Sequence, residues 1–149
     1  MIYGKQVEVL PDALFIGSFG AAANRAALEQ LKISHILCAS GSLPLQFPNV
    51  FEYLRLSIAD QPSVRIADSF PAAFAFIDSA LAGGGRVLVH CYLGRSRSAA
   101  LVLAFLVARR RLTLSEATAL LRGVRPQIQP NSGFLAELQQ LEQQQLHGT

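Results

Sequence analysis

The stretch VLVHCYLGRSRSAALVLAFLV, residues 87–107, decides the fold of this chain. The run RVLV at 86–89 predicts a short buried strand, and the mostly apolar run that starts near Arg97 and ends near Arg110 predicts a helix. Between the two lies a tight loop with one cysteine and two arginines. A strand that passes through a short loop into a helix is typical of α/β proteins.

The rest of the chain repeats this alternation. Further strands are predicted at 13–18, 33–40 and 51–58. Further helices are predicted at 21–32, from an Asp68 cap to about Leu81, from a Thr113–Glu116 capping box to Gly123, and from an Asn131 cap onward. We therefore expect a central, mostly parallel (mixed) sheet flanked by helices, with residues 139–149 frayed.

The composition limits the class of protein. The chain has 149 residues, 51% of them hydrophobic, and a formal net charge of +3, which predicts one folded domain and no nucleic-acid partner. The longest apolar run, 99–108, is too short to cross a bilayer, and the first ten residues lack the blocks of a signal peptide. Two cysteines form no disulfide framework. We expect a soluble protein of a reducing compartment, cytoplasmic or also nuclear, without a membrane partner and with its oligomeric state left open.

The loop after residue 90 has the features of an anion site. In α/β folds ligands bind beyond the carboxyl ends of the strands, and a helix N-terminus there presents unpaired N–H groups and a positive dipole. Gly94 permits a tight turn. We expect the loop N–H groups to surround a tetrahedral oxyanion, which Arg97 closes with a two-pronged donor. The cradle residues are Tyr92, Leu93, Gly94, Arg95, Ser96 and Arg97.

Cys91 lies in the same positive field, where thiols lose their proton easily. A thiolate aimed at a bound phosphate is a nucleophile already in position. The alternative is that Cys91 is a small buried side chain and the arginines are surface charge. That alternative treats the combination with Gly94, Arg97 and Ser98 as coincidence, and we favour the nucleophile.

The sequence HCYLGRSRS, residues 90–98, resembles the His-Cys-x5-Arg-Ser/Thr signature of the cysteine-dependent protein tyrosine phosphatases. The chain is similar to their small, atypical dual-specificity branch. ALFIGS at 13–18 resembles the opening strand of that branch, and RPQIQPNSGFLAELQQLE at 125–142 resembles its closing segment. The resemblance implies a single catalytic domain in 1–149, with its core at about 13–142.

The resemblance also implies residue roles. By position, Cys91 is the nucleophile, Arg97 the phosphate clamp, and Ser98 the donor that eases departure of the sulfur. His90 orients the loop by hydrogen bonding, and Asn131 supports it from the last segment. The chain departs from many relatives at two loop positions, which hold Leu93 and Arg95.

Cleavage of a phosphate ester also needs a proton for the leaving oxygen. Asp60 stands in a polar loop after the strand predicted at 51–58, and its spacing to Cys91 is similar to the family's acid-to-nucleophile spacing. The alternatives are that Asp60 caps a turn, or that Asp68 is the acid. Because Asp68 is well placed to cap a helix, we favour Asp60.

These residues predict metal-independent hydrolysis of phosphomonoesters through a cysteinyl phosphate, with no cofactor. The three histidines, His35, His90 and His147, are widely separated and suggest no metal cluster. The resemblance implies phosphotyrosine and phosphoserine or phosphothreonine in proteins as substrates. Alternatives are a phosphoinositide or other non-protein phosphatase, a phosphate-binding pseudoenzyme and a sulfurtransferase-type domain. Phosphoinositide enzymes often carry loop lysines, which this loop lacks.

Cys38 ends a strand that we expect to lie beside the strand before Cys91. Adjacent strands are about 4.8 Å apart, so a disulfide between the two cysteines is within reach. HILCAS, residues 35–40, also resembles a strand in some phosphoinositide phosphatases in which a cysteine protects the nucleophile. The alternative is that Cys38 only fills the core.

Overall fold

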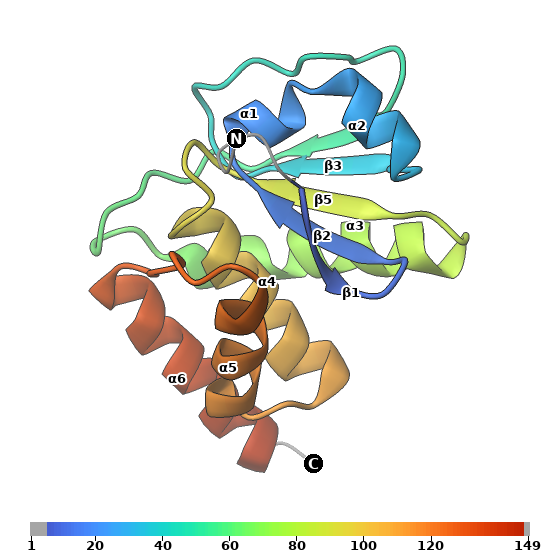
Figure 1. Cartoon of the computed structure of the whole chain (residues 1–149). Helices are drawn as coiled ribbons and strands as arrows, with labels where there is room; N and C mark the ends of the chain where they lie inside the picture. The colour runs from blue at the N-terminus through green and yellow to red at the C-terminus, as the bar shows by residue number, and fades with distance from the viewer. Residues whose placement is uncertain (1–5, 148–149) are drawn as a thin grey trace.

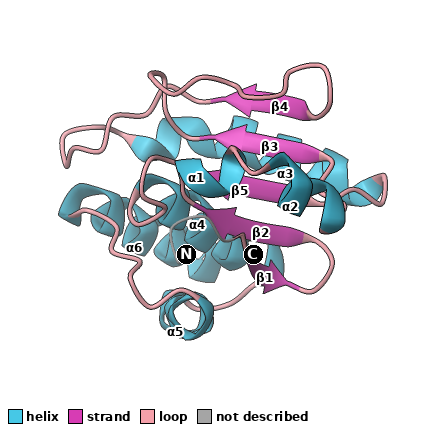
Figure 2. Cartoon of the chain, turned by 45° about the horizontal axis from the view of Figure 1, so that its top comes forward, coloured by secondary structure: helices cyan, strands magenta, loops and turns pink. Residues whose placement is uncertain are grey.

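The computed structural model describes residues 6–147. It contains a five-stranded sheet with the strand order β1-β2-β5-β3-β4 (Figures 1 and 2). β2, β5, β3 and β4 are parallel, and β1 is antiparallel to β2, so the predicted mixed α/β sheet is confirmed. The strands are β1 (Val7–Leu10), β2 (Leu14–Gly17), β3 (His35–Cys38), β4 (Glu52–Arg55) and β5 (Val87–His90).

The sequence analysis did not predict β1. This strand lies at the edge of the sheet, spans four residues and has a single buried side chain, Val9. An edge strand of this length gives too little alternation of apolar and polar residues to be recognised. Its pairing makes the sheet mixed rather than wholly parallel.

Helices cover both faces of the sheet (Figure 1). α1 (Phe19–Ala22) and α2 (Arg25–Gln30) lie on one face, and α3 (Phe70–Ala82) and α4 (Arg97–Arg110) lie on the other. α5 (Leu114–Val124) and α6 (Ser132–His147) pack against the outer side of α4. The larger core contains Leu14 and Ile16, whereas Phe15 points into the smaller core, as the period of a strand requires.

α4 lies at the centre of this larger core. Its residues from Ser98 to Val107 are all buried, which explains an apolar pattern that shows no polar face. None of the helices between residues 6 and 147 is long and apolar enough to span a membrane. Burial of α4 fixes the loop that precedes it, because the first turn of the helix cannot shift without disturbing the core.

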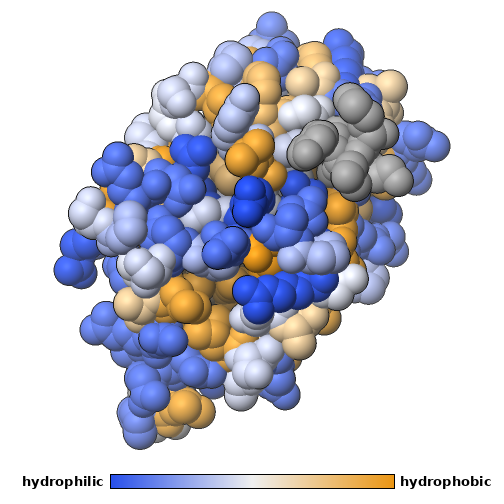
Figure 3. All heavy atoms as spheres, turned by 60° about the vertical axis from the view of Figure 1, so that its left-hand side comes forward, coloured by the Kyte–Doolittle hydropathy of each residue, from blue (hydrophilic) through white to orange (hydrophobic). Residues whose placement is uncertain are grey.

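The carboxyl ends of the parallel strands lie at one edge of the sheet, on the left of Figure 1. Figure 3 brings this side forward and shows strongly hydrophilic side chains near its centre, with separate hydrophobic patches around them. The loops that follow β3, β4 and β5 all start at this edge. The edge is therefore where residues from different parts of the chain can meet.

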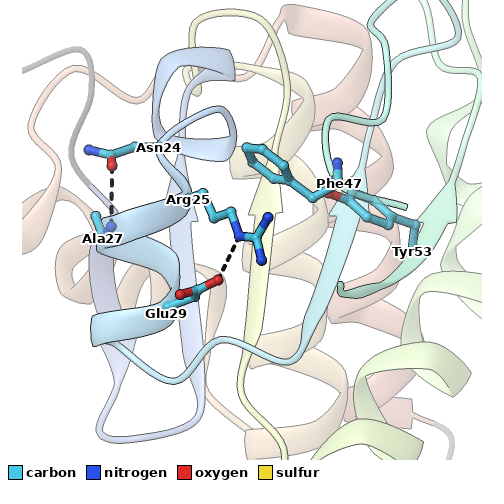
Figure 4. A network of polar contacts seen from close by, with 6 residues as sticks. All are labelled: Asn24, Arg25, Ala27, Glu29, Phe47 and Tyr53. Carbon is cyan, nitrogen blue, oxygen red and sulfur yellow. Dashed lines mark hydrogen bonds and ion pairs between the residues drawn. The ribbon is translucent and has the colours of Figure 1, made fainter. Parts of the chain in front are cut away.

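The helix predicted at 21–32 is wrong, because the structure has two short helices there. Asn24 lies between them, and its side chain accepts a hydrogen bond from the N–H of Ala27 at 3.2 Å (Figure 4). An N-cap residue has non-helical backbone angles, as Asn24 does with φ −95° and ψ 82°, so one continuous helix cannot pass through it. Arg25, the first residue of α2, pairs with Glu29 and lies over the ring of Phe47, which ties α2 to the long loop before β4.

The predicted cap at Asp68 is also wrong. A 3₁₀ turn at Ile66–Ser69 precedes α3, which begins at Phe70, and Pro71 stands in its first turn where proline is favoured. Asp68 instead lies on the surface, 3.6 Å from Arg65.

Two predicted caps are confirmed, and the predicted fraying is not. Thr113 and Glu116 form both bonds of a capping box, and the Asn131 side chain accepts from the N–H of Phe134 at 2.9 Å. α6 continues to His147, because Leu138 and Leu141 pack against the core; residues 148–149 lie outside the described residues.

Candidate active site

A cavity of about 300 Å³ lies at the carboxyl end of β5. The loop from β5 to α4 forms its floor, and the segment after β4 and the segment before α6 contribute walls. The cavity lies at the end of the sheet that Figure 3 brings forward. It brings together the predicted nucleophile, clamp, acid and loop residues; its lining consists of Asp60, Cys91, Tyr92, Leu93, Arg95, Ser96, Arg97 and Gln129.

Arg125 holds the floor of this cavity from behind. Its side chain is 2% exposed, and it donates hydrogen bonds of 2.8 Å to the carbonyl oxygens of Gly94 and Leu93. Burial lowers the pKa of Arg125, and nearby Cys91 acts in the opposite direction. Arg125 stands at the start of the closing segment 125–142, but no role was predicted for it. Its contacts join residues about thirty positions apart, which no local pattern reveals.

Gly94 is required at its position for two reasons. Its φ of 69° lies in the left-handed region, and a Cβ there would lie 2.6 Å from the carbonyl oxygen of Gly17 and 2.8 Å from Nη2 of Arg125. Any other residue would push the loop away from β2 and from its buried arginine. The predicted turn at Gly94 is therefore present. Glycine is required there both by the backbone conformation and by the close packing around it.

The carbonyls of residues 92–95 all accept hydrogen bonds from groups outside the loop. The carbonyl of Tyr92 accepts from the N–H of Phe19 at 3.0 Å, and that of Arg95 accepts from the N–H of Gln129 at 2.6 Å. Arg125 binds the two carbonyls between them. Each carbonyl is antiparallel to the N–H of the next residue across a trans peptide, and no cis bond occurs in the described chain. The N–H groups of residues 93–96 therefore point the other way, and form a cradle for an anion.

The sulfur of Cys91 lies at the bottom of this cradle. It is 3.2 Å from the N–H of Gly94, which donates to it, and 3.2 Å from the hydroxyl of Ser98. Cys91 is 2% exposed and Ser98 is fully buried in the first turn of α4. Two hydrogen-bond donors stabilise negative charge on a sulfur, both before it attacks and when it departs.

Arg97 lies across the cavity with a donor to spare. Its Nη1 donates to the carbonyl oxygen of Ile58 at 3.1 Å, which fixes the direction of the side chain. Its Nε is buried and has no hydrogen-bond partner within residues 6–147. Buried N–H groups without partners are rare and costly, so this one marks a position for a ligand oxygen.

Asp60 lies in the cavity wall, whereas Asp68 does not. Its Oδ1 accepts hydrogen bonds from the hydroxyl of Ser96 at 2.6 Å and from Nδ2 of Asn131 at 2.9 Å. The backbone N–H of Asn131 also donates to the Ser96 hydroxyl at 3.0 Å, which closes a triangle. The structure thus joins the segment after β4, the loop before α4 and the start of α6 at one carboxylate.

His90 lies behind the loop at the end of β5 and is 2% exposed. Its Nδ1 lies 3.3 Å from the carbonyl oxygen of Cys91. Burial, with a smaller contribution from Arg97, lowers the pKa of His90 to about 4, despite an opposing contribution from the Cys91 carbonyl. The imidazole is therefore neutral near pH 7, which suits a hydrogen-bonding role.

This pKa predicts how stability depends on pH. Between about pH 4 and pH 6.5 the unfolded chain binds a proton at His90 that the folded chain does not, so the free energy of unfolding rises with pH in that window. Because His90 stays neutral in the folded chain, it adds roughly 3 kcal/mol to the free energy of unfolding at pH values above 6.5, compared with pH values below 4. This difference is lost as the pH falls from 6.5 to 4. Urea unfolding at a series of pH values should show a smaller rise over this window in His90→Gln than in the wild type. An equal rise in both proteins would contradict the lowered pKa of His90.

Cys38 lies at the end of β3, which is hydrogen-bonded to β5 with Cys38 opposite His90. The prediction that these two strands lie side by side is therefore confirmed. Cys38 is fully buried, both cysteines are free thiols, and the Cys38 Sγ donates to the carbonyl of Ser40 at 3.5 Å. Burial raises the pKa of the Cys38 thiol.

The family model for the dual specificity phosphatase catalytic domain matches residues 14–144. The chain is 37% identical over 139 residues to dual specificity protein phosphatase 1B of Arabidopsis thaliana, and the match covers 93% of this chain and 83% of that protein. It is 40% identical over 143 residues to dual specificity protein phosphatase 2 of Mus musculus, covering 96% of this chain and 45% of that protein. The two relatives thus differ in how much sequence they carry beyond the matched region.

Solved structures agree with the sequence matches. The human tyrosine phosphatase-like serine/threonine/tyrosine-interacting protein has a TM-score of 0.90 at 36% identity, with 96% of this chain and 99% of that chain covered. Human DUSP28 has a TM-score of 0.88 at 32% identity, with 93% of each chain covered. The chain belongs to the dual specificity phosphatase catalytic domain family and is a hydrolase of the protein-tyrosine-phosphatase type, as the resemblance predicted.

Proposed function

We propose that this protein hydrolyses phosphotyrosine and phosphoserine or phosphothreonine in proteins through a phosphate ester of Cys91. One observation carries the proposal: a single cavity holds the Cys91 sulfur, the inward N–H groups of its loop, the unpaired Nε of Arg97 and the carboxyl of Asp60. These are the four components that phosphoryl transfer to a thiolate needs.

In the first step the Cys91 thiolate attacks phosphorus in line with the ester oxygen. The S–P bond forms as the P–O bond breaks, and Asp60 gives its proton to the departing oxygen. The loop N–H groups and Arg97 bind the equatorial oxygens, on which negative charge is spread. Because Oδ1 of Asp60 accepts from both Ser96 and Asn131, Oδ2 is the oxygen we assign to proton transfer.

In the second step water attacks the cysteinyl phosphate. Asp60, now ionised, removes a proton from this water, the P–O bond forms, and the S–P bond breaks. The electron pair returns to the Cys91 sulfur, where the Ser98 hydroxyl and the Gly94 N–H donate to it. Inorganic phosphate then leaves the loop.

The rim of the cavity supports a broad choice of phosphoester. Tyr92 is 58% exposed and Leu93 is 45% exposed, so both present apolar surface beside the opening. The cavity volume is at the lower end of ligand sites, which suits a phosphate and the atoms next to it more than a whole inositol headgroup. We further propose that the protein acts in the cytoplasm or the nucleus.

The test is a panel of phosphopeptides and phosphoinositides, assayed with and without EDTA and with vanadate. We expect full activity in EDTA, because N–H groups and an arginine supply the positive field. Vanadate should block activity, since it adopts the five-coordinate geometry of the transition state. Loss of activity in EDTA that a divalent ion restores would contradict the metal-free scheme. Turnover of phosphoinositides but not phosphopeptides would favour the alternative substrate class.

We also propose that Cys38 protects the nucleophile during oxidation. Peroxide oxidises the Cys91 thiolate to a sulfenic acid and is reduced; the Cys38 thiol then attacks that sulfur, and water leaves as the disulfide forms. Strand pairing next to Cys91 supports this proposal. Peptide mapping of oxidised, unreduced protein should detect the crosslink, and Cys38→Ser should recover less activity when thiol is added. If no linked peptide appears and recovery is unchanged, Cys38 only fills the core.

A further inference from the structure

The segment that carries Asp60 lies directly against the start of α6. Besides the bond from Asn131 to Asp60, two contacts further along α6 join these elements, at Gly133 and at Glu137. Both residues stand within the closing segment 125–142, but no role was predicted for either. Neither lines the cavity, so any part they have in the reaction is indirect.

At Gly133 the two backbones touch. A Cβ built on this glycine would overlap the carbonyl oxygen of Pro62 and lie 2.7 Å from its carbonyl carbon. Those atoms belong to the backbone two residues after Asp60, so a side chain at 133 could be accommodated only if the segment moved. Gly133 lies in a helix, where alanine is ordinarily the better residue. Close approach is therefore the reason for glycine here.

At Glu137 a carboxylate holds the other end of the segment. Its Oε2 accepts from the N–H of Ile66 at 2.9 Å, and its Oε1 accepts from the N–H of Ala67 at 3.3 Å. These N–H groups begin the 3₁₀ turn before α3, where intrahelical partners are lacking. Glu137 is half-buried, and Ile66 is fully buried in the core. In a glutamine at this position, the side-chain NH₂ group would face one of these backbone N–H groups, so two hydrogen-bond donors would oppose each other.

We propose that the first two turns of α6 hold the acid-bearing segment in its working position before substrate binds, with Gly133 and Glu137 as positioning residues for Asp60. The inference rests on the proposed role of Asp60 as the acid. The segment from 60 to 67 is hydrogen-bonded to Asn131, just before α6, and to Glu137 within α6. Between these bonds its backbone lies directly against Gly133, so Asp60 lines the cavity without a closing motion. A misplacement of about 1 Å can cost roughly 10²-fold in rate.

The test compares two kinds of substrate in Gly133→Ala and Glu137→Gln. Protonation matters much for an alkyl leaving group such as phosphothreonine and little for an aryl phosphate with an acidic phenol. We expect Gly133→Ala to lower kcat/KM for a phosphothreonine peptide about 10- to 100-fold, and for the aryl phosphate no more than about threefold. Glu137→Gln should change the ratio of the two rates in the same direction but less. Inhibition by vanadate should be unchanged, because the cradle is untouched.

The chain offers a matched control for each variant. Gly123 is also a helical glycine, and a Cβ there meets no atom within 4 Å, so Gly123→Ala should not change the ratio. Glu142 is also a carboxylate of α6 that accepts from a helix N-terminus, at the N–H of Leu114, but it lies away from the cavity. Glu142→Gln should therefore leave the ratio unchanged.

A double variant separates this inference from the proposed function. If Gly133 acts through Asp60, Gly133→Ala should lower the phosphothreonine rate little further in an Asp60→Asn background. Suppose that Gly133→Ala and Glu137→Gln lose activity equally on both substrates, whereas Asp60→Asn changes the ratio of the two rates. The positioning role would then be overturned, and the assignment of Asp60 as the acid would stand. An unchanged ratio in Asp60→Asn itself would overturn both. If Gly133→Ala does not fold, Glu137→Gln against Glu142→Gln decides the question.

Discussion

Cys91→Ser should lose turnover almost completely while it keeps its affinity for phosphate. A serine hydroxyl is a poor nucleophile near neutral pH without an adjacent base, whereas the N–H cradle and Arg97 remain. Loss of a covalent nucleophile costs about 10⁵- to 10⁶-fold in kcat. Steady-state kinetics and phosphate binding by calorimetry measure the two properties separately.

Cys38→Ser is the control for this variant. It makes the same chemical change at the end of the neighbouring strand, at a buried residue outside the cavity, and should retain activity in reducing buffer. Substantial activity in purified Cys91→Ser would remove Cys91 as the nucleophile. Loss of phosphate binding in Cys91→Ser would instead show that the sulfur is needed to form the cradle.

Asp60→Asn should have the second largest effect, and the effect should depend on the leaving group. General acid catalysis contributes about 10²- to 10⁴-fold, and most of it is needed when the departing oxygen is an alkoxide. We therefore expect a large loss of kcat/KM with phosphothreonine peptides and a small one with aryl phosphates of acidic phenols. The hydrogen bonds from Ser96 and Asn131 to Oδ1 can still form in the amide, so the variant should fold.

Asp68→Asn tests the rival assignment in the same assay. Asp68 lies on the surface beside Arg65 and does not line the cavity, so this variant should behave as the wild type with both substrates. A wild-type rate for phosphothreonine peptides in Asp60→Asn would mean that another group donates the proton. A leaving-group effect in Asp68→Asn would identify that group.

Features that depend on neighbouring residues could be predicted from the sequence. The loop after β5 needs a cysteine, a glycine, an arginine and a serine within eight residues, and these stand together in the chain. The Thr113–Glu116 capping box is equally local. The mostly parallel sheet followed from the alternation of strand and helix patterns. Buried α4 was predicted because it is apolar on every side.

Several features that depend on tertiary contacts were not predicted. Arg125 looks like a surface charge in the sequence, and only the folded chain places it under the loop carbonyls. The contact of Gly133 with Pro62 joins segments about seventy residues apart. α1 and α2 were merged because the run of alanines before Asn24 outweighed the capping preference of one asparagine. These three cases reflect either a long-range contact or a single polar side chain beside an apolar pattern.

The central claim is that phosphate passes through Cys91, and the direct measurement is to trap the intermediate. Ser98→Ala should slow the second step more than the first, because the hydroxyl 3.2 Å from the sulfur assists its departure. We expect rapid acid quench of this variant during turnover of an aryl phosphate, followed by mass spectrometry of its peptides, to find one phosphoryl group on the peptide that contains Cys91. The same quench of Cys91→Ser should find none. Release of phosphate at the normal rate with no phosphoryl group on Cys91, or with the group on another residue, would contradict the account.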